Sequence, residues 1–142
     1  MGYELLDEGT FADVAVKCKA ERLEDIFKYN SEAFAAIILD DTDAIKGNVE
    51  KILQVQADEP DLLLFDFVNE LIYQKDVNNL LFLPGNIEIE RQDGMLHLVA
   101  SMKGERIGKK CSFSVDVKAA TMHELSVIHD DEGWSSFMIL DV

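Results

Sequence analysis

Apolar and polar residues alternate with a period of two in several stretches, which is the pattern of strands with one buried face. One of these stretches contains Asp93-Gly94, a dipeptide that favours a tight hairpin turn, and the last one contains a second hairpin around residues 130–133. Together they predict about six strands, most of them antiparallel, in residues 11–20, 51–57, 86–101, 113–120 and 123–142.

Two other segments repeat their apolar residues at the spacing of an amphipathic helix. The second of them opens with acidic residues around Pro60, a residue suited to a first helical turn. The two apolar stripes comprise Leu23, Ile26, Phe27, Ala33, Phe34, Ile37 and Ile38, and then Leu64, Phe67, Val68, Leu71 and Ile72.

Two helices among about six strands do not form repeated strand-helix-strand units. The sequence therefore predicts an α+β fold with two layers, in which one mostly antiparallel sheet has both amphipathic helices packed on a single face. We expect residues 1–142 to form one domain, because no repeat, low-complexity tract or proline-rich linker divides them and 48% of the residues are hydrophobic.

The N-terminal residues are acidic, and no apolar stretch approaches the roughly 18 residues that a membrane-spanning helix needs. These features predict a cytoplasmic protein with no membrane association. Cys18 and Cys111 are then expected to be small buried thiols in a reducing compartment.

The charge is strongly negative, since 13 Lys and Arg residues stand against 28 Asp and Glu residues, for a net charge of −15. Such a surface disfavours direct binding to RNA or DNA, which depends on clusters of basic residues. Three readings of the acidity remain open: the protein binds cations, it meets a basic face of a protein partner, or its charge simply keeps it dissolved.

The sequence ends in a strand-like run whose last residues bear carboxylates. Alternation places Phe137, Ile139 and Asp141 on one face, so an apolar face ends in a charge. Asp13 occupies a similar polar position in the first expected strand. If the two strands are neighbours, Asp13, Asp141 and the terminal carboxylate of Val142 could offer oxygen ligands to calcium, magnesium or manganese. Taken singly, each aspartate is more simply a solvated strand residue.

Two further residues are candidates for contacts with a partner. Lys118 lies on the polar side of its expected strand, either as an ordinary exposed lysine or as a cation that holds a carboxylate or phosphate. His123 follows within one short turn, and a single histidine of this kind is more often structural than catalytic. The sequence contains none of the common nucleotide-binding, hydrolase or metalloprotease motifs, and neither cysteine lies in a CxxC motif.

Three segments together resemble the archease family in their order, spacing and distance along the chain: YELLD followed by TFADVAV, then VKAATMHEL, then WSSFMILDV at the C-terminus. The segment DFVNELIYQKDV is similar to that family's second helix. The resemblance therefore extends over essentially the whole chain.

This resemblance implies a protein cofactor without catalytic activity of its own. Archeases assist the GTP-dependent RNA ligase of tRNA splicing by promoting its guanylylation and its repeated turnover. The family's metal-binding aspartates correspond to Asp13 and Asp141, with the terminal carboxylate at Val142, and its lysine and histidine correspond to Lys118 and His123. The resemblance thus implies a divalent metal ion and an RNA ligase partner.

The chain departs from the family pattern at its first motif. The family has a histidine directly before Thr-Ala-Asp, whereas here residues 8–13 read EGTFAD, without the histidine and with Phe11 inserted. The segment before VKA also lacks a histidine that the family pattern contains.

Two functions of other classes compete with the cofactor interpretation. One is a small metal-dependent phosphohydrolase with Asp13 and Asp141 as ligands and His123 as acid or base. The other is a chaperone-like adaptor that binds proteins through an exposed apolar patch at residues 80–84.

Overall fold

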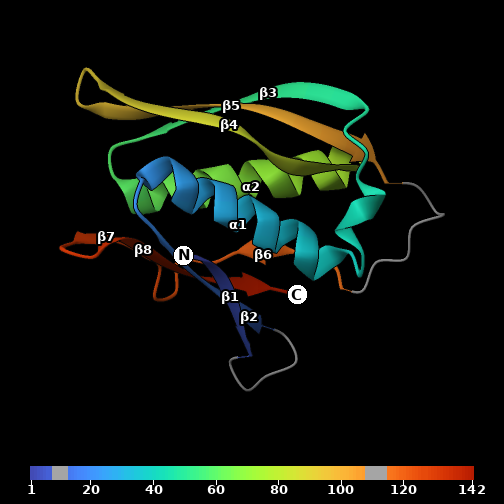
Figure 1. Cartoon of the computed structure of the whole chain (residues 1–142), viewed down its shortest axis with the longest axis horizontal. Coiled ribbons are helices and arrows are strands. Elements are labelled where there is room, and N and C mark those ends of the chain that lie inside the picture. The colour runs from blue at the N-terminus through green and yellow to red at the C-terminus, as the bar shows by residue number, and fades with distance from the viewer. Residues whose placement is uncertain (8–12, 108–114) are drawn as a thin grey trace.

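The two helices lie between two antiparallel sheets, so that the protein has three layers (Figure 1). This computed structural model describes residues 1–7, 13–107 and 115–142. Within them, the strands are β1 (Gly2–Asp7), β2 (Asp13–Ala20), β3 (Val49–Ala57), β4 (Leu80–Gln92), β5 (Met95–Arg106), β6 (Ala119–Ala120), β7 (Ser126–Asp130) and β8 (Gly133–Asp141), and the helices are α1 (Leu23–Ile38), α2 (Pro60–Asn78) and a short 3-10 turn, η1 (Thr42–Ala44).

The larger sheet is built around β8. Its strand order is β1-β2-β8-β6, and β7 also pairs with β8, on the stretch that precedes the β6 pairing. Every one of these pairings is antiparallel. β8 therefore has a neighbour on each side at its C-terminal end, where β2 and β6 flank it.

The smaller sheet has the order β3-β5-β4 and covers the other side of the helices (Figure 1). β4 and β5 form a hairpin through Asp93 and Gly94, both of which have positive φ, at 53° and 81°. Such φ values are those of the tight hairpin turns that Asp-Gly favours. The pairing shifts register between Leu83 and Asn86, where β4 is irregular next to Pro84.

Both helices are buried on a broad face because each contacts strands of both sheets. The rings of Phe27 in α1 and Phe67 in α2 meet edge to face with their centroids 5.6 Å apart. Asn30 ties α1 to the larger sheet, since its side-chain amide donates hydrogen bonds to the Ile26 carbonyl at 2.8 Å and to Ser136 Oγ at 3.2 Å. A buried amide needs such partners to offset its loss of hydration.

The α+β class, the two helices and the antiparallel pairing are confirmed, but the strands form two sheets where one was expected. The reason is that both helices are apolar over more than one stripe: α1 also buries Ala35, and α2 also buries Leu63. A second sheet covers that additional apolar surface. Among the described residues, no helix is long and apolar enough to cross a membrane.

Two more detailed expectations differ from the structure. Residues 113–120 were expected to form a strand, but Val115 to Lys118 are irregular and only Ala119 and Ala120 pair with β8. The apolar patch expected at residues 80–84 is mostly covered, because Leu80, Leu81 and Phe82 are at most 4% exposed. That burial removes the surface on which the adaptor interpretation depended.

The structure tests the expectation for one of the two cysteines and does not describe the first motif. Cys18 is buried and free, as expected, with 1% of its surface exposed. Cys111, Phe113 and the EGTFA segment that departs from the family pattern lie outside the described residues.

Candidate functional site

Asp13 and Asp141 lie directly opposite each other on neighbouring strands. Asp13 is the first residue of β2, Asp141 is the last of β8, and the two are paired in the antiparallel register. Residues paired in this way point to the same face, with Cβ atoms about 5 Å apart. Both are half-buried. The proximity on which the predicted metal site depended is therefore present.

Alternation along β8 separates the carboxylate from the core. Met138 and Leu140 belong to the hydrophobic core, and Val142 packs against it. Asp141 follows Phe137 and Ile139 on the opposite face, as the sequence predicts. Val142 thus fixes the chain beyond the end of β8 through its side chain, while Asp141 faces away from the helices.

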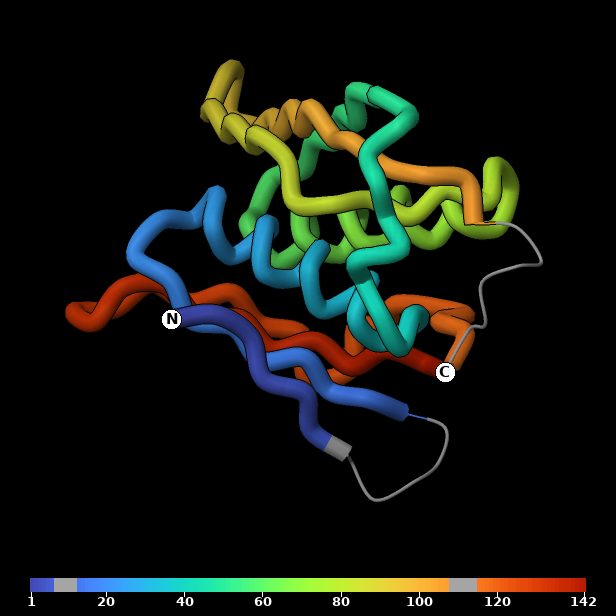
Figure 2. Tube along the Cα trace, turned by 45° about the vertical axis from the view of Figure 1, so that its right-hand side comes forward, coloured from blue at the N-terminus to red at the C-terminus, as the bar shows by residue number. Residues whose placement is uncertain are grey.

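The segment before β6 reaches the same end of β8 from the other side. The Lys118 amide donates a hydrogen bond to the Asp141 carbonyl at 2.8 Å, and Ala119 is the register partner of Asp141. The side chain of Lys118 is exposed and makes no ion pair with any described residue. Figure 2 shows the C-terminus beside the start of β2 and the approach to β6. We call this meeting of Asp13, Lys118, Asp141 and Val142 the acidic tip.

His123 lies apart from the acidic tip along the chain. Thr121 binds the Ile139 carbonyl through both its amide and its hydroxyl, each at 3.0 Å, and the chain then turns outward before β7 begins. His123 is exposed in that turn, next to Glu124 with φ of 55°. The structure thus brings four of the five predicted site residues together and leaves His123 on an adjacent turn.

The donor chemistry of the acidic tip fits a hard divalent cation. Two carboxylates directly opposite each other across a strand pair are close enough to share one bound cation. All the ligands offered are oxygens, as calcium, magnesium and manganese prefer. The described residues contain no group of three or more His, Cys, Asp or Glu side chains suited to hold a metal. Terminal carboxylate, water or partner oxygens would therefore have to complete the coordination.

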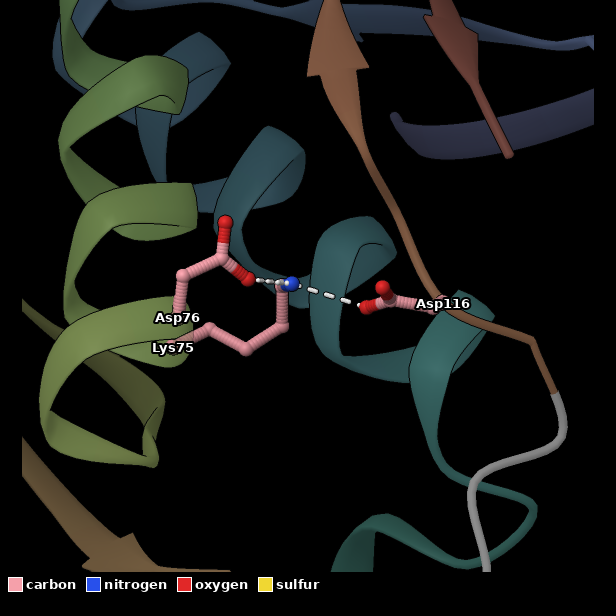
Figure 3. A network of polar contacts seen from close by, with 3 residues as sticks. All are labelled: Lys75, Asp76 and Asp116. Carbon is pink, nitrogen blue, oxygen red and sulfur yellow. Dashed lines mark hydrogen bonds and ion pairs between the residues drawn. The ribbon is translucent and has the colours of Figure 1, made fainter.

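An ion-pair cluster that the sequence analysis missed lies close to this segment in the chain. The Lys75 ammonium of α2 pairs with the neighbouring Asp76 carboxylate and, at 2.7 Å, with Asp116, which lies two residues before Lys118 (Figure 3). The Lys75 side chain is only 5% exposed, whereas both aspartate side chains are about half exposed, at 53% and 51%.

Charge and burial act in opposite directions on Lys75. Burial lowers its pKa, but the hydrogen bonds that Lys75 donates to Asp116 and Asp76, together with the negative charges of those carboxylates, outweigh burial and hold the pKa above its ordinary value. A signal for this residue was present in the sequence, because Lys75 continues the apolar stripe of α2, four residues after Leu71 and three after Ile72.

A family model described as the archease protein family matches residues 3–142, which is nearly the whole chain. The chain belongs to the archease family. This membership confirms the resemblance found in the sequence.

Individual archeases are similar to this chain over at least 90% of their own length. The protein archease of Methanothermobacter thermautotrophicus is 26% identical over 141 residues, which is 99% of this chain and 99% of that protein. The archease of Pyrobaculum calidifontis is 28% identical over 134 residues, covering 92% of this chain and 90% of its own. The solution structure of Methanobacterium thermoautotrophicum protein 1598 superposes with a TM-score of 0.86 at 26% identity and covers 99% of both chains.

Proposed function

We propose that this archease is a non-catalytic protein cofactor that activates a GTP-dependent RNA-splicing ligase and promotes its guanylylation and multiple turnover. One observation, added to the family membership, carries the proposal. Asp13 and Asp141 come from opposite ends of the sequence and meet as register partners at the ends of two neighbouring interior strands of the larger sheet. Carboxylates of directly opposed residues lie close enough together to bind one divalent cation between them.

In this proposal the acidic tip binds a divalent cation, whether calcium, magnesium or manganese. Asp13, Asp141 and the carboxylate of Val142 would hold it. When bound, the cation would supply positive charge for oxygens of the ligase or of its nucleotide. The packing of Val142 against the core keeps the strand end, and hence Asp141, at a fixed position.

Lys118 would make the contact to the partner at the acidic tip. Its amide is fixed to Asp141 while its side chain is exposed, so the ammonium is available to a carboxylate or phosphate of the ligase. His123, on the adjacent exposed turn, would contact the ligase beside it. Because this chain carries a net charge of −15, the ligase would supply the RNA contacts. Such a partner would place both proteins in the cytoplasm.

The decisive experiment measures guanylylation of the matching RNA ligase with GTP under multiple-turnover conditions. Wild-type protein should stimulate the ligase, and Asp141→Asn and Asp13→Asn should each lower that stimulation by roughly tenfold or more, since each removes a proposed metal ligand without changing its size. Asp131→Asn is the matched control, because Asp131 is an exposed aspartate in the β7–β8 turn of the same sheet. Equal stimulation by wild type and both tip variants would refute the proposal.

The competing phosphohydrolase interpretation makes a different prediction. It needs His123 as acid or base, but His123 lies on a turn beyond the acidic tip. We therefore expect the purified protein to show no phosphoester hydrolysis. Hydrolysis that is present in the wild type and lost in Asp13→Asn would support the phosphohydrolase interpretation instead.

A further inference from the structure

Lys75 projects from a backbone that is fixed on both sides. The Asn79 amide caps α2 by donating to the carbonyls of Gln74 and Lys75, with Asn79 in the left-handed conformation at φ of 56°. The smaller sheet holds the same helix end, since Arg106 donates to the Asn78 carbonyl at 3.1 Å and the Ile107 amide donates to Asn79 at 2.7 Å. The backbone at the end of α2 is therefore held in place, and the Lys75 side chain, which is 5% exposed, extends from it in a defined direction.

Asp116 belongs to a segment that lacks this kind of support. Residues 115–118 are irregular, and pairing with β8 begins only at Ala119. Three consecutive residues nevertheless anchor this part of the chain. Asp116 pairs with Lys75, the side chain of Val117 is fully buried at 0% exposure, and the Lys118 amide binds the Asp141 carbonyl. These three contacts take the place of ladder hydrogen bonds in setting the path to the acidic tip.

The charge at residue 75 contributes little to stability by itself. Burying an ammonium costs free energy, and its pairing with two half-exposed carboxylates returns only somewhat more than that cost. An apolar side chain of similar length would fill the same position in the stripe of α2. What an apolar residue would not provide is a directed bond to Asp116 across a sequence separation of 41 residues.

We propose that Lys75 is a positioning residue that holds residues 116–118 against the end of β8 and thereby places Lys118 beside the Asp13–Asp141 pair. The part of this inference that concerns ligase activation rests on the function proposed above. The part that concerns the path of the chain does not depend on it.

The first test measures amide hydrogen exchange at Lys118 by NMR in wild type, Lys75→Met and Asp76→Asn. Methionine keeps the apolar length of the side chain and removes the charge. Lys75→Met should speed exchange of the Lys118 amide by about tenfold, while amides in the centre of β5 keep their wild-type rates. Asp76→Asn is the matched control, because it removes an ion pair with the same ammonium but leaves Lys75 bound to Asp116. Its Lys118 amide should exchange as in wild type.

The second test measures ligase stimulation by the same variants and by Asp116→Asn. Lys75→Met and Asp116→Asn should each reduce stimulation about threefold to tenfold. The double variant should stimulate the ligase as well as either single variant, since both substitutions remove the same Lys75–Asp116 contact. Lys75→Arg should restore part of the stimulation because it keeps the charge. A merely structural role would instead lower the thermal stability of every variant in parallel with its activity.

The outcomes separate the two proposals. Unchanged exchange at Lys118 in Lys75→Met overturns the inference whatever the ligase does. Faster exchange together with full stimulation overturns the part that concerns ligase activation, because Lys118 would then work without being held. Faster exchange with reduced stimulation supports it. If wild-type protein fails to stimulate the ligase at all, the proposed function falls, and the exchange rates alone decide whether Lys75 positions the segment.

Discussion

Cys18 is a buried thiol whose surroundings suppress its ionisation. It lies on the core face of β2 with 1% of its surface exposed, and burial, countered in part by a hydrogen bond with Ser136, raises its pKa from 9.0 to about 12. The thiolate is the reactive form of cysteine. At neutral pH, Cys18 is therefore a packing residue of the sheet that carries the acidic tip.

Alkylation should reveal this protection. The raised pKa leaves very little thiolate at pH 8, and burial further blocks access of the reagent. We expect iodoacetamide to label Cys18 in the folded protein at least about a hundredfold more slowly than in urea. Mass spectrometry of the separated peptides measures this residue apart from Cys111. Equal rates in both conditions would contradict the buried position.

Lys75 should make stability sensitive to alkaline pH. Its folded pKa lies above the unfolded value of about 10.4, so the stabilisation from its charged form is fully present below that value and is lost as pH rises through the folded pKa. The difference in unfolding free energy between wild type and Lys75→Met should be constant from pH 7 to about pH 9. Above about pH 10.5 the wild type should lose unfolding free energy relative to the variant. Urea titrations at each pH measure it, and a difference that stays flat to pH 12 would contradict the ion pair.

The sequence reveals some site residues more readily than others. Asp141 can be found because it ends an apolar face of a strand with a charge, whereas Asp13 follows the alternation of its strand and is suggested mainly by the resemblance to the family. Lys75 has a weaker signal, since a lysine in an apolar stripe is usually expected to extend its ammonium to solvent. That this ammonium finds Asp116 depends on a contact between residues 41 positions apart. No local pattern specifies such a contact.

At the scale of the elements, the β4–β5 hairpin contains two glycines that are required for different reasons. Gly94 has φ of 81° and open space around its Cβ position, so only backbone conformation constrains it. Gly104 in β5 has ordinary strand geometry, but a Cβ there would lie 2.5 Å from the Leu81 carbonyl oxygen and 2.6 Å from the ring of Phe82. The close approach of β4 and β5 at this point therefore requires glycine.

These two glycines provide a paired stability prediction. Gly94→Ala should lower the unfolding free energy by about 1 kcal/mol, the usual cost of placing alanine at positive φ. Gly104→Ala should cost about 3 kcal/mol or more, because backbone and a buried ring must move. Thermal or urea unfolding compares them directly. The reverse order would show that the hairpin turn, and not the packing of β4 on β5, limits stability.

Most elements, but not their grouping, could be predicted from the sequence. Both helices, both hairpins and the strand around Val16 follow local periodicity and turn chemistry, which act over a few residues. The irregular path of residues 115–118 could not be predicted, because its alternating apolar pattern is that of a strand. There Lys75 binds Asp116 and the core takes up Val117, so tertiary contacts override the local pattern.

At the scale of the whole molecule, negative charge is the dominant electrostatic feature. The net charge of −15 is spread over a chain of 142 residues, so the folded state carries considerable self-repulsion. The opposed pair Asp13 and Asp141 adds to it locally. Divalent cations should relieve this repulsion in two ways, by general screening and by binding at the acidic tip.

Thermal unfolding in different salts distinguishes these two contributions. If the tip binds calcium, a concentration of 100 times Kd should stabilise the wild type by about 2.7 kcal/mol beyond sodium chloride of equal ionic strength. The gain should be largely lost in Asp13→Asn and retained in Asp131→Asn. Magnesium and manganese are tested in the same series. An identical gain in all three proteins would indicate screening alone.

The three-layer arrangement is a property of the whole molecule that the sequence predicts only in part. Alternation shows that each strand has one apolar face. The same alternation occurs whether the strands form one sheet or two, so it does not predict the number of sheets. The wider apolar surface of α2, which includes Leu63 as well as Leu64, indicated burial on more than one side. Which strands pair is decided by contacts such as β2 with β8, between residues more than 100 positions apart.

The pairing of Asp13 with Asp141 also limits how this protein can change over generations. Side chains alternate along β2 and β8, so inserting or deleting one residue within either strand would turn its carboxylate toward the helices and its core residues toward solvent. Without a bulge to absorb it, such a mutation would disrupt the larger sheet and the acidic tip together. Descendants can therefore exchange residues at the tip one by one and vary the lengths of their loops. A change of one residue in either strand can persist only where a bulge absorbs it, as the extra residue between Leu83 and Asn86 is absorbed in β4.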